Sequence, residues 1–376
     1  MFEVSIWGKG ERIVKLDKSP FRNPEITNFK LNRRFITPLG AISALGLIAV
    51  FLMPSPAAGQ TLKMGTNALK VAPAAAKPWV VTKTPDGQPD LQGYWSNNTM
   101  TPLQRPRGVT KESYTKEEFL EAAKKQAELD GEEATPGTIE DVHYDHTQFG
   151  LDRTQATLTP NLRTSMITDP PNGRTPSLTA EGQKRAADLA EERRNRGAQY
   201  NQAQNLAFGT RCIYMNAGPP MLPATYNHTY QIVQSPGLVM ILIEELHEVR
   251  LIPLDGRPHA PQNVRSWLGD SRGHWEGNTL VIETTNFNDK VAFQGSSRDA
   301  KVTERLTRTG DETIQYEFTV EDPHTWTRPW RAEMPFIKTS GPIFEHACSE
   351  GNYSMSNMLA GARAEEKRAA EAAAKK

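Results

Sequence analysis

Several features that mark common protein classes are missing from this sequence. The 376 residues include only two cysteines, no glycine-rich phosphate loop and no dinucleotide fingerprint, so we expect no cofactor. No basic stripe interleaved with aromatic residues occurs, and 44 lysines and arginines balance 44 aspartates and glutamates. This balance argues against nucleic acid or an anionic membrane surface as a partner.

The composition is otherwise that of a globular protein rich in turns. Hydrophobic residues make up 37% and charged residues 23% of the chain, with 27 prolines and 27 glycines. The length suits one large domain or two modest ones. No pattern specifies an oligomeric state.

The first sixty residues have the pattern of an export signal. A basic segment with Arg33 and Arg34 precedes the apolar run of residues 35–53, and small residues follow as far as Gly59. This order predicts a secretory signal over residues 1–59 and a periplasmic or secreted protein. The alternative is that the signal is not cleaved and anchors the protein in the membrane, because the apolar run approaches the ~20 residues that span a bilayer. We expect no other contact with a membrane.

The two cysteines, Cys212 and Cys348, both follow the predicted signal. In an oxidising compartment they are expected to pair, and the disulfide would stabilise the fold by ~4 to 5 kcal/mol for a loop of that size. A free nucleophile or a soft metal ligand is the alternative, but no Cys-x-x-Cys pattern accompanies either cysteine.

Beyond the signal, the chain is expected to form one β domain with added helices. Residues 60–90 are rich in proline and predict a linker, and residues 91–376 predict the domain itself. Helix-capping patterns at Thr115 and Thr179 indicate a helical insertion over residues of about 110–200. An alanine-rich terminal helix is expected over about 355–374.

From Thr225 onward, strand patterns dominate. Six to eight runs with alternating side chains are joined by short turns, and one run places Ile314, Tyr316, Phe318 and Val320 on a single face. We therefore predict a mainly β fold: an antiparallel lipocalin-like barrel or a strongly curled sheet.

Six segments of the sequence support the same fold through their resemblance to a protein family. Gly93-Tyr94-Trp95 matches the Gly-x-Trp that opens many lipocalin-type barrels. Together the segments resemble a family of exported, functionally uncharacterised bacterial proteins over nearly all of residues 84–364, which implies a lipocalin or calycin-like barrel and export but no mechanism. The segments are TPDGQPDLQGYW, RTSMITDPPNGR, HEVRLIPLDGRPH, WLGDSRGHWEGNTLVIETTNF, EFTVEDPHTWTRPW and HACSEGNY.

The stretch GDSRGHWEGNTLVIETTNF carries the densest group of reactive side chains. His274 and Glu276 flank Trp275, so on a strand both point to one side, as an acid–base pair at a barrel mouth would. Asp270 and Arg272 precede them as a possible partner and anion-binding group. The alternative for Asp270 and Arg272 is a salt bridge or a turn cap. The alternative for His274 and Glu276 is a solvated edge of the strand.

The segment HEVRLIPLDGRPH is the second cluster. His247 shares a strand face with Val249 and Leu251, which suits a core histidine or an imidazole facing a barrel cavity. Arg250 lies on the other face, and Arg257 could hold an anionic group of a substrate. The remaining candidates for ligand contacts in the strand region are His259, Trp267, Trp275, Glu304, Tyr316 and Trp326.

A metal site is the weakest of these hypotheses. His143 and His146 lie three residues apart beside two aspartates, but the glutamate and the spacing of a zincin helix are absent. We therefore predict no metal.

Three functions fit these patterns. We predict first an exported barrel that binds a small, partly apolar or aromatic molecule in its lumen. The alternative is a lyase, isomerase or hydrolase without a cofactor, with His247 or His274 as the base. The third is a structural protein of the cell envelope.

Side-chain directions separate the three. Convergence of His247, Arg250, Arg272 and Glu304 in a cavity would favour the enzyme. A wide apolar lumen would favour binding, and a filled core would favour the structural role.

Overall fold

The computed structural model describes residues 79–130, 161–195, 200, 202–215, 218–223, 228–290 and 293–375, all within the unit of residues 71–376. In this part of the chain ten strands form one sheet. They are β1 (Gly93–Ser96), β2 (Ile167–Asp169), β3 (Thr229–Ser235), β4 (Leu238–Ile243), β5 (Val249–Pro253), β6 (Asp270–Glu276), β7 (Thr279–Thr285), β8 (Lys301–Gly310), β9 (Thr313–Glu321) and β10 (Trp330–Thr339).

The described helices lie before and after the main run of strands. The α-helices are α1 (Lys116–Asp130), α3 (Ala180–Asn195) and α4 (Tyr353–Ala374), and the short 3-10 turns are η2 (Ala203–Asn205), η3 (Glu245–His247) and η4 (Phe293–Gly295). Eight of the ten strands follow Thr225, in line with the predicted number.

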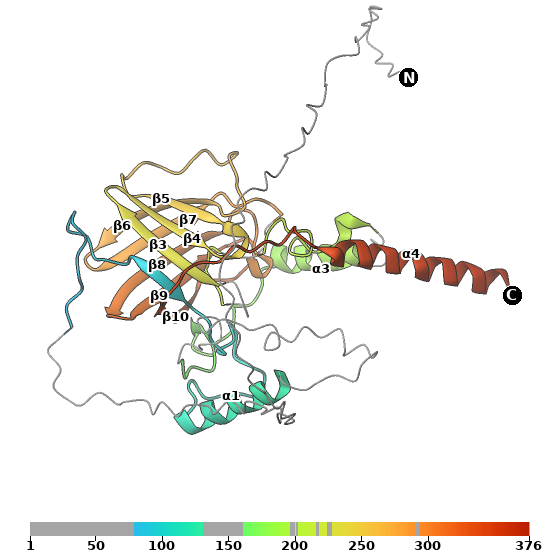
Figure 1. The fold of residues 1–376 in the computed structure, drawn as a ribbon, viewed down its shortest axis with the longest axis horizontal. Coiled ribbons are helices and arrows are strands. Elements are labelled where there is room, and N and C mark those ends of the chain that lie inside the picture. Colours follow the sequence, from blue (N-terminus) through green and yellow to red (C-terminus); the bar gives the residue numbers. More distant parts are fainter. Residues whose placement is uncertain are drawn as a thin grey trace, which may run out of the picture. The chain divides into compact units, whose positions relative to one another are not determined.

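The sheet has a simple antiparallel order. Its main path is β5-β4-β3-β1-β10-β9-β8-β7-β6, and β2 pairs with β10 beside that path (Figure 1). Each of these pairs is antiparallel. Because direction alternates along the path of nine, the two edge strands, β5 and β6, run in the same direction.

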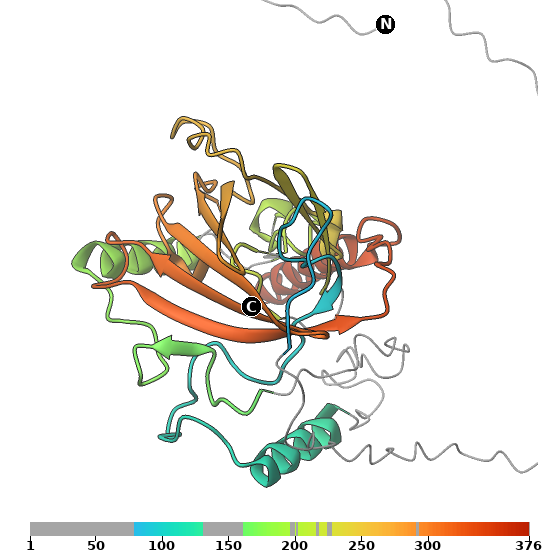
Figure 2. The ribbon, with the colours of Figure 1, turned by 90° about the vertical axis from the view of Figure 1, so that its left-hand side faces the viewer.

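The sheet curls so far that these two edges meet (Figure 2). A Cβ atom placed on Gly273 of β6 would lie 2.7 Å from side-chain atoms of both Ile252 and Leu254. Arg250 Nη2 of β5 lies 3.3 Å from Ser271 Oγ of β6. Both contacts advance in the same direction along the two strands, as parallel neighbours require.

No backbone ladder joins β5 to β6 in the described residues, so the sheet is strongly curled but not closed. We call this junction the seam. Parallel neighbours cannot be joined by a tight hairpin and need a connection of about a dozen residues or more. Residues 254–269 provide it, and we call them the crossover.

The interior of the curled sheet is filled with side chains. On β9 the face of Ile314, Tyr316, Phe318 and Val320 is buried, as the alternation predicts. The rings of Tyr316 and Phe336 lie 4.9 Å apart between centroids. Burying each such side chain contributes about 1.5 to 3 kcal/mol. These residues fill this part of the interior, and the binding of a ligand in a lumen stays a prediction.

Trp95 of the Gly-x-Trp tripeptide lies on β1 and belongs to the core. The indole is fully buried, and its Nε1 donates to the Leu91 carbonyl at 2.9 Å. The guanidinium of Arg308 on β8 lies 5.7 Å from the ring centroid. Gly93 has a φ of 128°, a conformation that glycine adopts more readily than other residues.

The predicted helix caps form. The Glu118 N–H bonds to Thr115 Oγ1 at 3.2 Å, and the Thr115 N–H bonds to the Glu118 carboxylate at 2.8 Å, which is a capping box. Thr179 Oγ1 accepts from the Gly182 N–H at 3.0 Å at the start of α3. The terminal helix begins two residues before the predicted range.

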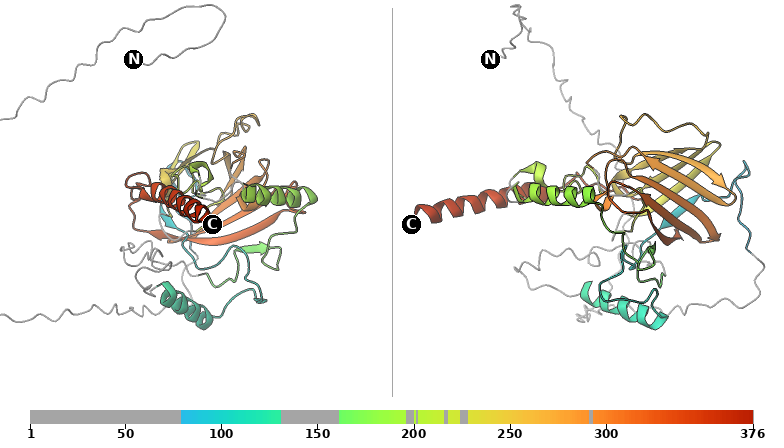
Figure 3. Two further views of the ribbon diagram at one scale, coloured as in Figure 1. Left: turned by 90° about the vertical axis from the view of Figure 1, so that its right-hand side faces the viewer. Right: turned by 180° about the vertical axis from the view of Figure 1, so that it is seen from behind.

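A disulfide joins Cys212 to Cys348, with a Cα separation of 5.7 Å. It connects the segment before β3 to the segment between β10 and α4. The pairing confirms the prediction for the two cysteines. Among the described residues, no helix has both the length and the apolar character needed to cross a membrane. Figure 3 shows the strands from two further sides.

Candidate functional site

A buried polar network crosses the apolar interior next to the seam. Arg250 Nη1 on β5 donates to Glu304 Oε1 on β8 at 3.0 Å, and Nη2 makes a second, short contact with Glu304 Oε2. The Tyr316 hydroxyl donates to Glu304 Oε1 at 2.7 Å and accepts from the Met221 N–H at 2.9 Å. The side chains of Arg250 and Glu304 are 1% and 0% exposed, so neither charge reaches water.

Two hydroxyl groups extend this network to the neighbouring strands. Arg250 Nη2 lies 3.3 Å from Ser271 Oγ on β6 and 3.4 Å from Thr284 Oγ1 on β7, and the two hydroxyls lie 2.9 Å apart. Burial opposes the charge on Arg250, but Glu304 outweighs burial and the pKa of Arg250 is raised. The ion pair joins β5 to β8, and the hydroxyls of Ser271 and Thr284 extend the network to β6 and β7. These side chains hold the two edges of the sheet together where no backbone ladder does.

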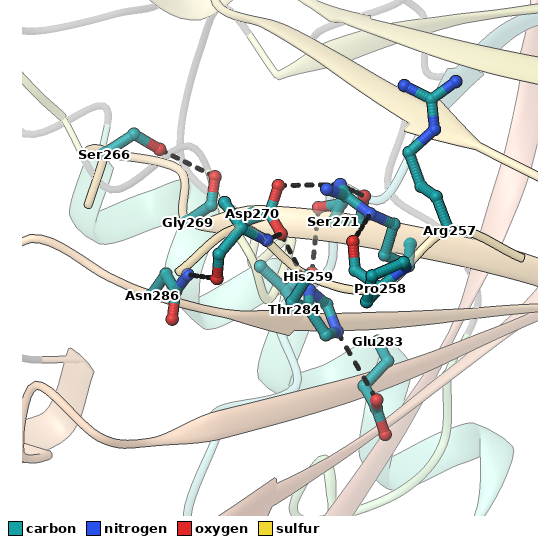
Figure 4. A network of polar contacts seen from close by, with 12 residues as sticks. Arg257, Pro258, His259, Ser266, Gly269, Asp270, Ser271, Glu283, Thr284 and Asn286 are labelled. Atoms are coloured by element: carbon teal, nitrogen blue, oxygen red, sulfur yellow. Dashed lines mark hydrogen bonds and ion pairs between the residues drawn. The ribbon is translucent and has the colours of Figure 1, made fainter. Parts of the chain in front are cut away.

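The second polar cluster lies on the outer face of β6 and is shown in Figure 4. The strand alternates, with Ser271 and Gly273 buried and the side chains between them facing outward. Asp270 accepts from Arg272 Nη1 at 2.7 Å and from the Ala260 N–H at 2.9 Å, and its Oδ2 lies 2.9 Å from His259 Nδ1. The salt-bridge interpretation of Asp270 and Arg272 is therefore correct.

This outer cluster fastens the crossover to the sheet. His259 and Ala260 belong to the crossover, and Arg272 Nε donates to the Pro258 carbonyl at 3.1 Å. Burial alone would raise the pKa of Asp270, but the Ala260 amide, His259 and Arg272 hold it below its usual value. A carboxylate with a lowered pKa is a poor general base near neutral pH.

His274 and Glu276 point to one side, as predicted, but that side is the solvent. His274 Nε2 lies 3.2 Å from Glu276 Oε1, and their side chains are 60% and 50% exposed. Arg305 on β8 also binds Glu276, at 2.8 Å, and lowers its pKa together with His274. The structure therefore gives the pair the solvated position and does not place it in a barrel mouth.

His247 does not lie on a strand, which corrects the prediction for its segment. It ends η3, where Leu246 and His247 have φ values of 54° and 55°. Like Val249 and Leu251, with which it was grouped, His247 is exposed, so this face of the segment points outward and not into a core, and His247 Nε2 accepts from the His346 N–H at 3.1 Å. His247 instead lines a shallow hollow outside β3 and β4, and the predicted convergence with Arg250, Arg272 and Glu304 is limited to Arg250 and Glu304.

The remaining residues that were predicted to contact a ligand lie at different places, from the surface to the core. Arg257 is exposed and pairs with Asp255, two residues away. Trp326 is buried in the core, and Trp275 packs against the core with its Nε1 lacking a partner in the described residues. Trp267 stacks on Tyr214, with ring centroids 5.6 Å apart and planes at 23°. Of these candidates, Trp267 also borders a cavity.

Sequence reasoning missed a buried acid–histidine pair. His228 Nε2 lies 3.1 Å from Glu245 Oε2, and the side chains are 6% and 5% exposed. Burial lowers the pKa of His228 to about 4 and raises the pKa of Glu245 to about 8. Burial thus disfavours the charged form of both groups. No periodic pattern marks either residue, because the contact joins the start of β3 to a turn.

A cavity of about 300 Å³ opens at one end of the seam, between β5 and the crossover. In this seam cavity, groups from both edges of the sheet, an aromatic ring and ionisable side chains adjoin empty space. Its lining consists of Glu248, Val249, Arg250, Leu251, Ser266, Trp267, Leu268, Gly269, Asp270 and Ser271.

The described residues offer no group of three or more His, Cys, Asp or Glu side chains arranged for a metal ion. His143 and His146 lie outside the described residues, and their metal hypothesis stays a prediction.

Comparisons with known proteins add little to this geometry. No family model matches the chain, and no curated protein matches it. Among solved structures, a secretory abundant heat soluble protein from Ramazzottius varieornatus is similar at 12% identity and a TM-score of 0.21. The match covers 31% of this chain and 74% of that one, and a likeness this weak carries no functional argument.

Proposed function

We propose that this chain is an exported, lipocalin-like protein that binds a small, partly apolar molecule in the seam cavity. The proposal moves the predicted ligand from the lumen to the junction of β5 and β6. The cavity between the two unpaired edges is the observation that carries it.

The seam supplies two kinds of contact that a ligand needs. The edges of β5 and β6 lack ladder partners on the facing sides, so backbone donors and acceptors are available there. Apolar surface lies beside them, because Leu251 is 56% and Val249 44% exposed and Trp267 forms one wall. Polar and charged side chains alternate with this apolar surface in the lining, and such groups fix the orientation of a ligand in small-molecule sites.

Export is the second part of the proposal. The sequence before Gly59 has the order of a secretory signal, and the Cys212–Cys348 disulfide is of the kind that persists in oxidising compartments. Both features favour the periplasm or the exterior as the place where the ligand is met.

The buried His228–Glu245 pair favours a second candidate, the cofactor-free lyase, isomerase or hydrolase. Burial raises the pKa of Tyr214, and the carboxyls of Glu248 and Glu245 add to this rise, so the pair lies near the ring that stacks on Trp267. A buried acid–histidine pair can exchange a proton, as acid–base chemistry requires. Conversion of a bound compound by the wild type, and its loss in His228→Phe, would support this candidate.

Native mass spectrometry of the protein purified from its own envelope fraction tests the binding proposal. We expect a retained small molecule in the wild type and its absence in Leu251→Lys, which places a charge at the cavity wall. Val264→Lys is the matched control, since Val264 is 55% exposed on the crossover and does not line the cavity. Retention of the molecule by Leu251→Lys would contradict the seam cavity as its site, and the absence of a bound molecule in the wild type would favour the structural role.

A further inference from the structure

The charges around the seam cavity do not cancel. Three ionisable side chains line it, and two of them have partners: Arg250 binds Glu304, and Asp270 binds Arg272 and His259. Glu248 is the third. Within the described part of the chain its carboxylate has neither a hydrogen bond nor an ion pair, so the lining carries one uncompensated negative charge.

This carboxylate is also partly withdrawn from water. Glu248 is half-buried where η3 leads into β5, and burial raises its pKa. A partly buried carboxylate without a partner is destabilising, and a cation or a strong donor beside it relieves that cost. The charged groups close to it in the lining do not serve, because Arg250 is bound by Glu304 and Asp270 by Arg272, and burial raises the pKa of Tyr214, so that hydroxyl supplies no charge.

An aromatic wall faces the same space. One side of the Trp267 indole is covered by Tyr214, and Phe208 meets it edge-on with centroids 5.4 Å apart. This packing fixes the orientation of the indole where it borders the cavity. A tryptophan face attracts cations through its quadrupole by about 0.5 to 2 kcal/mol.

We propose that the seam cavity takes an organic cation: an amine or quaternary ammonium with an apolar portion, with Glu248 as its counter-ion and Trp267 as its aromatic wall. This inference rests on the proposed binding function and names the class of ligand. The volume of about 300 Å³ is at the lower end for small-molecule sites, which favours a ligand with a single ring or a short chain.

Three probes of matched shape test the inference: benzylamine, benzyl alcohol and benzoate, titrated by calorimetry at neutral pH. We expect benzylamine to bind most tightly and benzoate most weakly. Glu248→Gln should weaken benzylamine by about tenfold, the loss of one charge-assisted hydrogen bond, and leave benzyl alcohol unchanged. Glu345→Gln is the matched control, because Glu345 is exposed and lines the other hollow.

The outcomes separate the inference from the function on which it rests. If benzyl alcohol or benzoate binds as tightly as benzylamine or more tightly, the preference for cations is overturned. If that binding is also lost in Leu251→Lys, a binding site at the seam remains. Benzylamine binding that Glu248→Gln does not change would also overturn the inference. If none of the three binds and no molecule is retained by the purified protein, both the function and the inference are contradicted.

The pH dependence provides a second readout. Benzylamine stays protonated throughout the acid range, so its affinity should fall only as Glu248 becomes protonated. Because burial raises the pKa of Glu248, the fall should begin at a higher pH than for an exposed glutamate. Glu248→Gln should remove this dependence, and a dependence that survives the substitution would contradict the role of Glu248.

Discussion

The β8–β9 hairpin and the β5–β6 seam are built from the same sheet in opposite ways. In the hairpin the backbone ladder runs from Lys301↔Glu321 to Gly310↔Thr313, and side chains only pack against it. At the seam no ladder is present in the described residues, and side chains join the strands: Arg250 reaches Ser271, and Gly273 lets the edges touch. The comparison indicates that a parallel junction in an otherwise antiparallel sheet is held by polar side chains and leaves a cavity.

Removing the buried ion pair should produce the largest effect. Glu304→Ala leaves Arg250 buried without a counter-ion, and we expect a loss of about 3 to 5 kcal/mol in the free energy of unfolding. Glu317→Ala in the hairpin, where the carboxylate lies 3.8 Å from Arg331 at the surface, should cost less than about 1 kcal/mol. Urea denaturation of both variants measures the difference.

The double variant Arg250→Met, Glu304→Leu provides the control for that experiment. Replacing both charges by apolar groups of similar volume should recover most of the lost stability. A double variant as unstable as Glu304→Ala would show that the charge of Arg250 is not the cause.

A methyl group placed in the seam should have an intermediate effect. Gly273→Ala brings a Cβ to 2.7 Å from Ile252 and Leu254, and overpacking of this kind costs about 1 to 3 kcal/mol. Gly310→Ala in the hairpin meets nothing closer than 4.0 Å and should be close to neutral. Thermal unfolding measures the loss of stability in the two variants. Equal losses would contradict the close contact of the two edges.

The outer cluster should contribute least, and its contribution depends on pH. The folded pKa of Asp270 is lowered, so its stabilisation is present above the unfolded pKa of about 3.9 and is lost as the pH falls through the folded value. Asp270→Asn should cost below about 1 kcal/mol at neutral pH, because water screens the cluster, and less in acid. A difference from the wild type that stays constant down to acid pH in urea titrations would argue against this role.

Local patterns predicted the elements that local interactions determine. The face of Tyr316 and Phe318 follows from alternation alone, and the capping box of Thr115 follows from residues three apart. The disulfide was predictable because two cysteines allow one pairing. The tripeptide Gly93-Tyr94-Trp95 marked the first strand, although it did not indicate the contact of Trp95 with Arg308.

The seam could not be predicted, because it depends on contacts that no short window contains. Nothing near Arg250 indicates that Glu304, 54 residues later, will neutralise it. Alternation grouped His247 with Val249, and both are exposed, but it could not show that this face points to solvent or that two consecutive residues with positive φ keep His247 off the strand. The group from Asp270 to Glu276 suggested a reaction site because its charges are close in sequence, whereas its ion-pair partners in the crossover and on β8 are distant in sequence and could not be foreseen.

Amide hydrogen exchange compares the two regions most directly. If β5 and β6 meet without a backbone ladder, the amides of these strands that do not bond to β4 or β7 will exchange much faster than those shared by β8 and β9. Strong and equal protection of the amides on both sides of the seam would mean that a parallel ladder closes the sheet. That result would contradict the open junction on which the cavity and its ligand depend.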